Sequence, residues 1–392
     1  MDEKILALDM GGTSVKARMY EDGRVEKTTK WEHNYRDCGL ENAKEDLVDR
    51  INSFCDCGLD AIGLGIAGLI ATDNSLYRST VLTSFVGFNL PDFLRKEFNV
   101  KAVSIDNDAD CGAISEFNFR EEHERYAPLF YFVVGSGIGS AYINGSRSLP
   151  YKVRLEPEHK FSEKDNPIPN DVGLQLPIPK NYIYEIFKRY NVPKNDVEKF
   201  LVDENGEQLK GPNQEKSSVR ASVFGSTTSL KRILNIYLKS RSGIDLVTWR
   251  RLYEAECRKF CYQHHFEIPE EYREVDLDVL TNERKTSEFM GFLASYKDST
   301  ALDAFKIFGC FLGYSIAEAQ KIVKKEQKLE GYPRAHLKGV IIKSFPFFEK
   351  SLFETVKERK VKCDFNTGPQ LSLDLEGANL RGAYLQASKL LK

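Results

Sequence analysis

The sequence predicts an α/β protein of more than one domain with a cleft between the domains. Three observations support this prediction. The chain has 392 residues, which is about 2.6 times the roughly 150 residues of a typical domain. Hydrophobic residues make up 41% of it, and the aromatic residues are 25 Phe, 18 Tyr and 2 Trp, so a large core can be buried and wholesale disorder is excluded. In the first 145 residues, strand patterns separated by glycine turns alternate with helical patterns.

The first 145 residues predict two β-hairpins with helices and strands between them. An apolar run over residues 5–10, a Gly-Gly turn and an alternating stretch over residues 15–20 form the first hairpin pattern. The elements expected after it are a helix at 41–54, a buried strand at 61–70, a helix at 91–98, a strand at 103–105 and a helix at 109–117. The second hairpin has strands at 129–134 and 141–143 and ends at an Asn-Gly pair. Two hairpins of the same kind indicate a duplicated α/β core.

The rest of the chain is more helical and begins with a polar stretch. Pro, Asn, Asp, Glu and Lys dominate residues 160–216, and residues 203–216 are almost free of apolar side chains, which predicts an exposed, mobile insertion. Beyond it the pattern predicts helices at 228–264, 299–326, 352–360 and 377–391, with a short strand at 339–342.

Charge and cysteine content limit the possible partners and compartment. Lys and Arg total 56 against 58 Asp and Glu, a net charge of −2, which argues against a surface that coats nucleic acid or an anionic membrane. No apolar run reaches the roughly 18 residues that a membrane span needs, and the N-terminus lacks the pattern of a signal peptide. The eight cysteines follow no disulfide spacing. We therefore expect a cytoplasmic protein with free thiols and with neither nucleic acid nor membrane as a partner.

A first glycine turn lies between the two strands of the first hairpin. Gly11 and Gly12 allow backbone amides to approach a phosphate, and Thr13 and Ser14 add hydroxyl donors. Asp9 would face those phosphates and repel them unless a divalent cation lies between, so it suits a magnesium ligand that acts through water. The alternative is an ordinary Gly-Gly turn with a surface aspartate.

The second hairpin contains the turn Gly-Ser-Gly-Ile-Gly, from Gly135 through Ser136 and Gly137 to Gly139. It is not a dinucleotide-binding sequence, because the third glycine comes one position too early and a strand follows where a helix is needed. Neither glycine turn has the Gly-Lys-Ser/Thr of a Walker A loop. Two such turns in one chain suggest a clamp that holds a polyphosphate from two sides.

Between the two hairpins the sequence Asp-Asn-Asp-Ala-Asp ends a strand and opens a helix. It is not an EF-hand, because Cys111 and Phe117 stand where that loop needs Gly and Glu. Asn107 and Asp108 suit helix capping, for which Asn and Asp are preferred. A carboxylate fixed at a strand-to-helix corner is also suited to accept a proton from a substrate hydroxyl while that oxygen attacks phosphorus.

Four motifs together resemble the ROK family of sugar kinases and related repressors. They are D-M-G-G-T-S-V-K-A, G-L-G-I-A-G, N-D-A-D-C-G-A-I-S-E and V-V-G-S-G-I-G-S-A-Y-I-N-G, in the order and spacing of that family, and the similarity is dense over residues 4–160. The resemblance implies a two-lobed α/β fold of the actin-like ATPase (ribonuclease H-like) type with a cleft between the lobes. It places residues 1–117 and the C-terminal helix 377–392 in one lobe. The second lobe, 118–376, then carries an insertion at about 160–216 and extra helices at 228–300.

The resemblance also implies roles for particular residues. Asp108 matches the catalytic base that deprotonates the terminal hydroxyl of the sugar. Magnesium would be held by Asp9, through water. The residues implied to bind the phosphates of ATP are Gly11, Gly12, Thr13, Gly135, Ser136 and Gly137, and those implied to bind the sugar are Gly68, Asn107, Glu156 and His159.

Several departures from the family pattern limit these implications. The family's zinc loop has no counterpart, so we predict no structural zinc. Cys257, Cys261, His264 and His265 suit a partly buried helix better than a metal site. Residues 341–348 replace the glycine pair expected after the late strand, which puts the usual adenine pocket in doubt. The sequence from Glu156 to His159 resembles the family's sugar-binding motif E-x-G-H, but Pro157 and Glu158 are unusual at its two middle positions.

These observations predict an ATP-dependent kinase that phosphorylates a terminal hydroxyl of a hexose or hexose derivative, with ATP and Mg²⁺ as cofactors. The implied partners are the sugar and ATP, with a homodimer possible. The chain begins at the first motif, so we expect no DNA-binding helix-turn-helix. The main alternative is a catalytically weak relative that acts as a sugar-binding sensor or protein-interaction module. A third is an ATPase of the actin or Hsp70 kind that uses no sugar.

Overall fold

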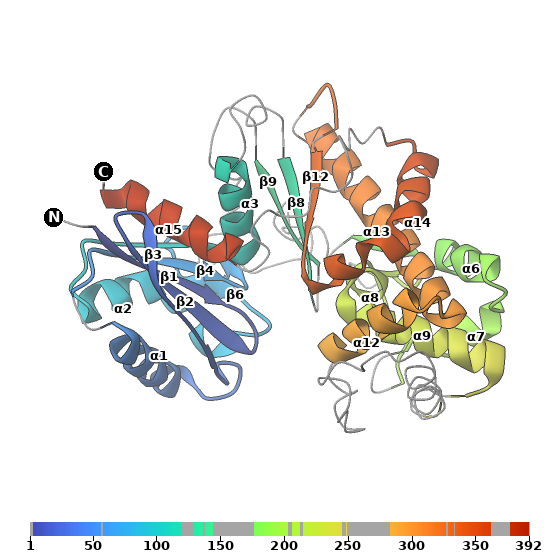
Figure 1. Ribbon diagram of the computed structural model, residues 1–392, viewed down its shortest axis with the longest axis horizontal. Coiled ribbons are helices and arrows are strands. Elements are labelled where there is room, and N and C mark those ends of the chain that lie inside the picture. The colour runs from blue at the N-terminus through green and yellow to red at the C-terminus, as the bar shows by residue number, and fades with distance from the viewer. Residues whose placement is uncertain are drawn as a thin grey trace.

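The computed structural model describes most of the chain and shows two groups of elements that meet at a central helix (Figure 1). The residues described are 3–55, 58–119, 129–135, 138–143, 176–202, 206–211, 215–244, 248, 283–326, 328–332, 334–361 and 377–391. One group is a five-stranded sheet with its covering helices. The other is a three-stranded sheet with a helical region packed beside it.

The first sheet places the ends of three parallel strands along one edge. Its order is β3-β2-β1-β4-β7, with β1 (Lys4–Met10), β2 (Ser14–Glu21), β3 (Arg24–Glu32), β4 (Ala61–Ile66) and β7 (Ala102–Asn107). β1, β2 and β3 pair antiparallel, whereas β1, β4 and β7 run parallel in a register that aligns Met10, Ile66 and Asn107. Since side chains and loops that follow parallel strands meet at one edge, this edge collects Asp9 and the start of the helix after β7.

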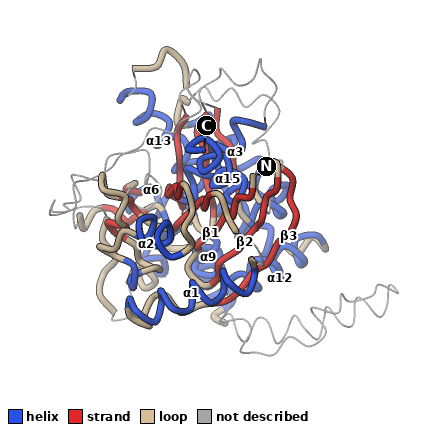
Figure 2. The backbone as a smooth tube through the Cα atoms, turned by 90° about the vertical axis from the view of Figure 1, so that its left-hand side faces the viewer, coloured by secondary structure: helices blue, strands red, loops and turns tan. Residues whose placement is uncertain are grey.

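Helices cover both faces of this sheet. α1 (Leu40–Phe54) and α2 (Leu90–Glu97) pack on the face formed by residues such as Leu6, Leu8 and Met10. α15 (Ala378–Leu391) packs on the opposite face, against Ile5 and Ala7. In Figure 2, α15 and α1 lie on opposite sides of the strands. Both faces of β1 are apolar and buried, because its successive side chains point to opposite faces of the sheet and each face is covered by helices.

The central helix, α3 (Asp108–Phe119), joins the two groups. It packs against α15 and β4 on one side and against β8 (Leu129–Val134) and β9 (Ile138–Ile143) on the other. β8 and β9 form the second sheet with β12 (Arg334–Lys338), which runs parallel to β8. The other face of this sheet belongs to a large core that includes Phe130 and Phe132. Where the chain divides into lobes stays a prediction.

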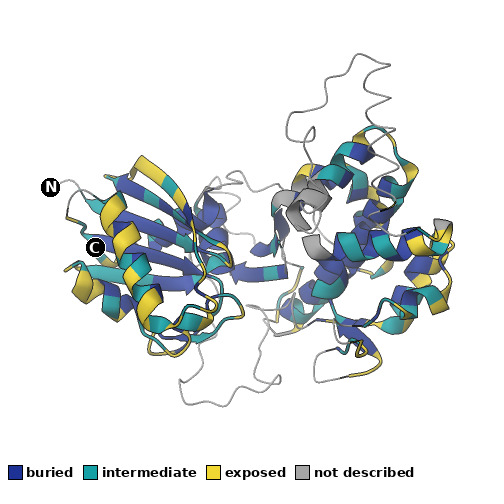
Figure 3. Ribbon diagram, turned by 90° about the horizontal axis from the view of Figure 1, so that it is seen from below, coloured by how far each residue is buried: buried dark blue, intermediate teal, exposed yellow. Residues whose placement is uncertain are grey.

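The helical region is built around one long buried helix, α13 (Ser299–Glu326). The helices packed against it are α6 (Lys180–Arg189), α8 (Ser222–Gly225), α9 (Thr227–Ser242), α12 (Glu283–Ser295) and α14 (Phe345–Glu358). The region also contains α7 (Lys194–Glu198) and the paired strands β10 (Pro177–Pro179) and β11 (Ser218–Arg220). Within the described residues, α13 is also the one helix long and apolar enough to cross a membrane by length and composition, and 78% of that window is buried inside the protein. This share of buried residues is that of a core helix. Figure 3 shows buried residues in the interior of both groups of elements.

The structure corrects two expectations about the second half of the chain. The strand expected at 339–342 is wrong: β12 ends at Lys338, and Val340–Ser344 form the 3-10 helix η5. Gly339 ends the strand with a φ of 128°, a backbone conformation that favours glycine. No helix or strand was expected in the polar stretch 160–216, but it contains β10, α6 and α7. Ile183 and Phe187 of α6 are fully buried in the core.

Other expected features are confirmed, although some of the helices and strands begin or end at other residues than expected. The exposure expected of 203–216 holds for most of its described residues, since Gly206 to Gln208 and Glu215 to Lys216 are exposed. The buried strand expected at 61–70 is β4 followed by β5 (Leu69–Ile70), which pairs with β6 (Leu76–Arg78). The helix expected from 228 ends, as α9, at Ser242, and residues 249–264 lie outside the described part of the chain. β3 was not predicted.

The close contact between α15 and the first sheet yields the first prediction. A methyl group on Gly63 of β4 would overlap the carbonyl oxygen of Ala383 in α15, and this contact is with backbone, which cannot move aside cheaply. We expect Gly63→Ala to lower the free energy of unfolding by about 3 kcal/mol, as overpacking of a core does. Denaturant unfolding measures this. Gly58→Ala is the control because nothing lies within 4 Å of the added methyl group, and an equal effect of the two changes would contradict the packing argument.

Candidate active site

Side chains from four elements meet at the edge where β1 and β7 end. Asp9 lies near the end of β1, and Asp108 is the first residue of α3. Asn379, at the start of α15, donates a hydrogen bond from Nδ2 to Asp9 Oδ1 at 3.1 Å. Lys338, the last residue of β12, donates from Nζ to Asn379 Oδ1 at 3.2 Å. A chain of hydrogen bonds thus links the end of the first sheet to the end of the second.

Asp108 has the electrostatic character of a general base. The pKa of Asp108 is raised from 3.8 to about 6, first by burial and then by the negative charge of Asp9. The backbone amide of Ala109 and the positive charge of Lys338 act on this pKa in the opposite direction. A carboxyl group with such a pKa is mostly ionised at neutral pH, yet it accepts a proton more readily than an ordinary aspartate does.

Asn107 caps α3 and links it to the turn between β4 and β5. Its Oδ1 accepts a hydrogen bond from the amide of Ala109 at 2.8 Å, and its Nδ2 donates to the carbonyl of Gly68 at 3.0 Å. The capping expected for this corner is therefore present at Asn107. A side chain on Gly68 would overlap the carbonyl of Arg78, so glycine is needed there. The sugar-binding roles of Asn107 and Gly68 stay predictions.

The first glycine turn is short and braced from one side. The Gly11 amide donates to the carbonyl of Ser14 at 3.1 Å, and a methyl group added to Gly12 would lie 3.0 Å from Val81 Cγ1. Gly12 and Thr13 are exposed to solvent. The turn therefore holds a fixed shape while its tip stays accessible, which is the arrangement that amide binding of phosphate requires.

His33, the residue after β3, is a brace of this turn that the sequence did not reveal. Its Nδ1 accepts from the Tyr35 amide at 3.1 Å, so the hydrogen lies on Nε2, which donates to the Gly11 carbonyl at 3.0 Å. The ring stacks on Tyr35 with 4.0 Å between centroids, and the Tyr35 hydroxyl donates to Asp46 at 2.8 Å. Burial lowers the pKa of His33 below 6.5, which keeps the ring neutral.

The surroundings of Asp9 fit a hydrated magnesium ion. Asp9 is 13% exposed, and its second carboxylate oxygen lies 3.7 Å from Lys16 Nζ, beyond the usual length of a hydrogen bond. Asp108 lies close enough for the two negative charges to repel, as its raised pKa indicates. A divalent cation held by Asp9 through water would relieve that repulsion.

The second glycine turn is described in part. Gly135 follows β8 and is described, whereas Ser136 and Gly137 lie outside the described residues. Glu156 and His159 also lie outside them, as do Cys257, Cys261, His264 and His265. Within the described ranges, no three His, Cys, Asp or Glu side chains gather as a metal site. The absence of structural zinc stays a prediction.

Comparison with known proteins agrees with this arrangement. Residues 5–149 match the sequence model of the ROK family. The N-acetyl-D-glucosamine kinase of Yersinia pestis bv. Antiqua (strain Nepal516) is 28% identical over 141 residues, which are 35% of this chain and 54% of that enzyme. The chain thus spans about half the length of the curated relatives that it matches.

Solved structures extend the likeness over nearly the whole chain. The ROK family glucokinase from Streptomyces griseus, in complex with glucose and AMPPNP, has a TM-score of 0.61 at 13% identity and covers 98% of this chain and 99% of its own. A ROK family transcriptional regulator, a homologue of the Escherichia coli MLC protein, has a TM-score of 0.59 at 13% identity over 99% of this chain and 80% of the regulator.

The chain therefore has the two-lobed α/β fold of the actin-like ATPases. Its residues 5–149 are similar in sequence to the ROK family.

The brace at His33 yields a second prediction. His33→Phe keeps a stacked ring but leaves the Gly11 carbonyl and the Tyr35 amide without their partner. We expect a loss of about 1–3 kcal/mol in the free energy of unfolding at pH 7.5. Because the pKa of His33 is lowered in the folded protein, its contribution is complete above 6.5 and is lost as pH falls below that value. The difference between wild type and variant should narrow towards pH 5.

Denaturant unfolding across this pH range measures the effect. Glu32→Gln, at an exposed neighbour on the same strand, should leave stability unchanged. A difference between wild type and His33→Phe that stays constant from pH 7.5 to pH 5 would show that the ring is not held neutral.

Proposed function

We propose that this chain is an ATP-dependent kinase that phosphorylates a terminal hydroxyl of a hexose or hexose derivative. The observation that carries the proposal is Asp108: a carboxylate fixed at the start of α3, with its pKa raised to about 6, beside the glycine turn that Asp9 precedes. Relatives that match the first part of the chain are kinases of N-acetyl-D-glucosamine. A sugar of that kind, or glucose, is the substrate class that we propose.

The residues divide the chemistry between them. Asp108 would take the proton of the sugar hydroxyl as its oxygen forms a bond to the terminal phosphorus of ATP, while the bond to the leaving diphosphate breaks. The backbone amides of the exposed residues Gly12 and Thr13, together with the turn that begins at Gly135, would hold the phosphates. Magnesium supplies charge neutralisation to those phosphates, and Asp9 would hold it through water.

The proposed sugar ligands are Asn107, Gly68, Glu156 and His159. Asn107 is held at both ends of its amide, which fixes the position of the adjacent Asp108. Such fixing matters because a general base must lie within hydrogen-bond reach of the proton that it abstracts.

One observation favours a second candidate function. The fold of the chain is as close to a ROK family transcriptional regulator as to several of the kinases, with a TM-score of 0.59. The second candidate that we propose is a catalytically weak protein that acts as a sugar-binding sensor or protein-interaction module, and the experiment below separates the two functions.

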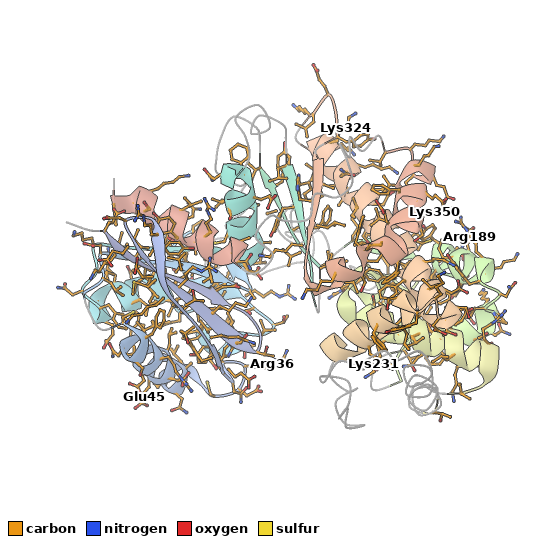
Figure 4. The ribbon with its side chains drawn as sticks, in the orientation of Figure 1. Arg36, Glu45, Arg189, Lys231, Lys324 and Lys350 are labelled. Carbon is orange, nitrogen blue, oxygen red and sulfur yellow. The ribbon has the colours of Figure 1, made fainter. Side chains whose placement is uncertain are left out.

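Asp108→Asn is the direct test of the kinase proposal. The amide keeps the shape of the side chain but cannot accept the hydroxyl proton, so we expect the sugar-dependent rate to fall by about 10²- to 10⁴-fold. ADP release is measured with N-acetyl-D-glucosamine, glucose and other hexoses, and circular dichroism checks the fold. Lys350→Met, on an exposed side chain of α14 (Figure 4), is the control. Wild-type protein that binds a sugar but releases no ADP would favour the sensor.

The raised pKa of Asp108 also predicts the pH dependence of turnover. Only the carboxylate accepts a proton, so kcat/KM should be level above pH 7 and should fall about tenfold per pH unit below a pKa of about 6. The residual rate of Asp108→Asn should lack this acid limb. An acid limb that persists unchanged in Asp108→Asn would assign the titration to another group.

A further inference from the structure

Lys338 is a lysine with little access to solvent at the junction of the two sheets. It is 8% exposed, although it ends a strand whose next residue is a glycine. Its Nζ donates to Asn379 Oδ1, an acceptor that carries no charge. Its positive charge is near enough to Asp108 to lower the pKa of that carboxyl group. A lysine is rarely buried to this degree unless its charge has a use or a partner.

The backbone of Lys338 is fixed beside the second glycine turn. Lys338 is in register with Val133 of β8. Gly339 then turns with a φ of 128°, and a methyl group there would overlap the carbonyl of Val134. Gly135, the first residue of the second turn, follows Val134 directly. This close approach leaves Lys338 little freedom to move along the strand.

The side chain of Lys338 reaches towards the first glycine turn. Asn379, which accepts from Lys338 at 3.2 Å, donates in turn to Asp9 at 3.1 Å. Asp9 lies two residues before Gly11. The ammonium group therefore lies between the end of β8, which leads into one turn, and the end of β1, which leads into the other.

We propose that Lys338 contacts the terminal phosphate of the bound nucleotide and neutralises its charge during transfer. This inference rests on the proposed function. The site already holds the carboxylates of Asp9 and Asp108, and a nucleoside triphosphate adds several more negative charges, so a cation at this point lowers the electrostatic cost of binding. As the hydroxyl oxygen bonds to the terminal phosphorus, the electron pair of the breaking bond stays on the leaving diphosphate. The proton goes to Asp108, and the ammonium group offsets the remaining charge.

The test compares ligands that differ only in their phosphates. Calorimetry measures binding of MgATP, AMP and inorganic tripolyphosphate to the full chain in the absence of sugar. We expect Lys338→Met to weaken binding of MgATP and of tripolyphosphate about tenfold or more, as loss of one charged contact does. Binding of AMP should change less than about twofold. Turnover should fall by about 10²- to 10³-fold, as it does when one donor to the transition state is removed.

Three further variants separate a phosphate contact from a structural role. Lys338→Arg keeps the charge and should recover much of the binding of MgATP. Asn379→Ala removes the acceptor but leaves the lysine, so it should cost less than Lys338→Met. Lys350→Met, whose side chain is 89% exposed, should change nothing. If Lys338→Met does not fold, Lys338→Gln is the fallback for that variant, because its side chain keeps a polar donor but bears no charge.

Two results would overturn the inference. The first is a Lys338→Met variant that loses affinity for AMP and MgATP equally, or that loses affinity for neither. Either outcome would mean that the lysine makes no phosphate contact and has only a packing role. The second is wild-type protein that binds neither MgATP nor tripolyphosphate. Wild-type protein that binds MgATP through Lys338 but never phosphorylates a sugar would support this inference and remove the kinase proposal, so the two failures are distinguishable.

Discussion

The close packing of α15 on the first sheet and on α3 is the contact on which the arrangement of the site depends. Two glycines permit it: Gly63 in β4 lies against the backbone of Ala383, and Gly382 in α15 lies against the carbonyl of Cys111 in α3. Near the other end of α15, Gln386 donates to the buried carboxylate of Asp106. The helix is held along its length, and its first turn therefore has a fixed position relative to the ends of β1 and β7.

This position gives Asn379 its place between two groups of opposite charge. One end of its amide binds the carboxylate of Asp9 and the other end accepts from Lys338. An amide is suited to this because it offers a donor and an acceptor without adding charge. The same surroundings explain the balance at Asp108, where burial and Asp9 disfavour the ionised form while Lys338 and the helix amide favour it. The pKa near 6 is thus the outcome of contacts from several elements rather than a property of the motif.

The local features of the site could be predicted from the sequence, and its long-range contacts could not. The glycine turn after Asp9 and the strand-to-helix corner at Asp108 are formed by residues that are neighbours in the sequence, so the local sequence is sufficient to predict them. The helix Ser299–Glu326 was also placed correctly, because its long run of small and apolar residues suits a helix that is buried on all sides. β3 was missed because most of its residues are exposed and carry no apolar alternation. Asn379 stands 370 positions from Asp9, and no spacing rule connects residues so far apart.

The observed end of β12 changes the interpretation of residues 341–348, which depart from the family pattern. That segment was expected to put side chains where a nucleotide needs backbone, on the assumption that the strand extends to 342. β12 ends instead at Lys338, and the close backbone approach occurs at Gly339, beside Val134. Phe345 and Phe348 begin α14 and pack into the core, where Phe348 meets Phe308 of α13 with 5.2 Å between ring centroids. Their rings are directed inward because burying an aromatic ring is strongly favourable. The feature of this region that bears on phosphate binding is therefore the lysine before the turn, and the aromatic residues after it serve the core.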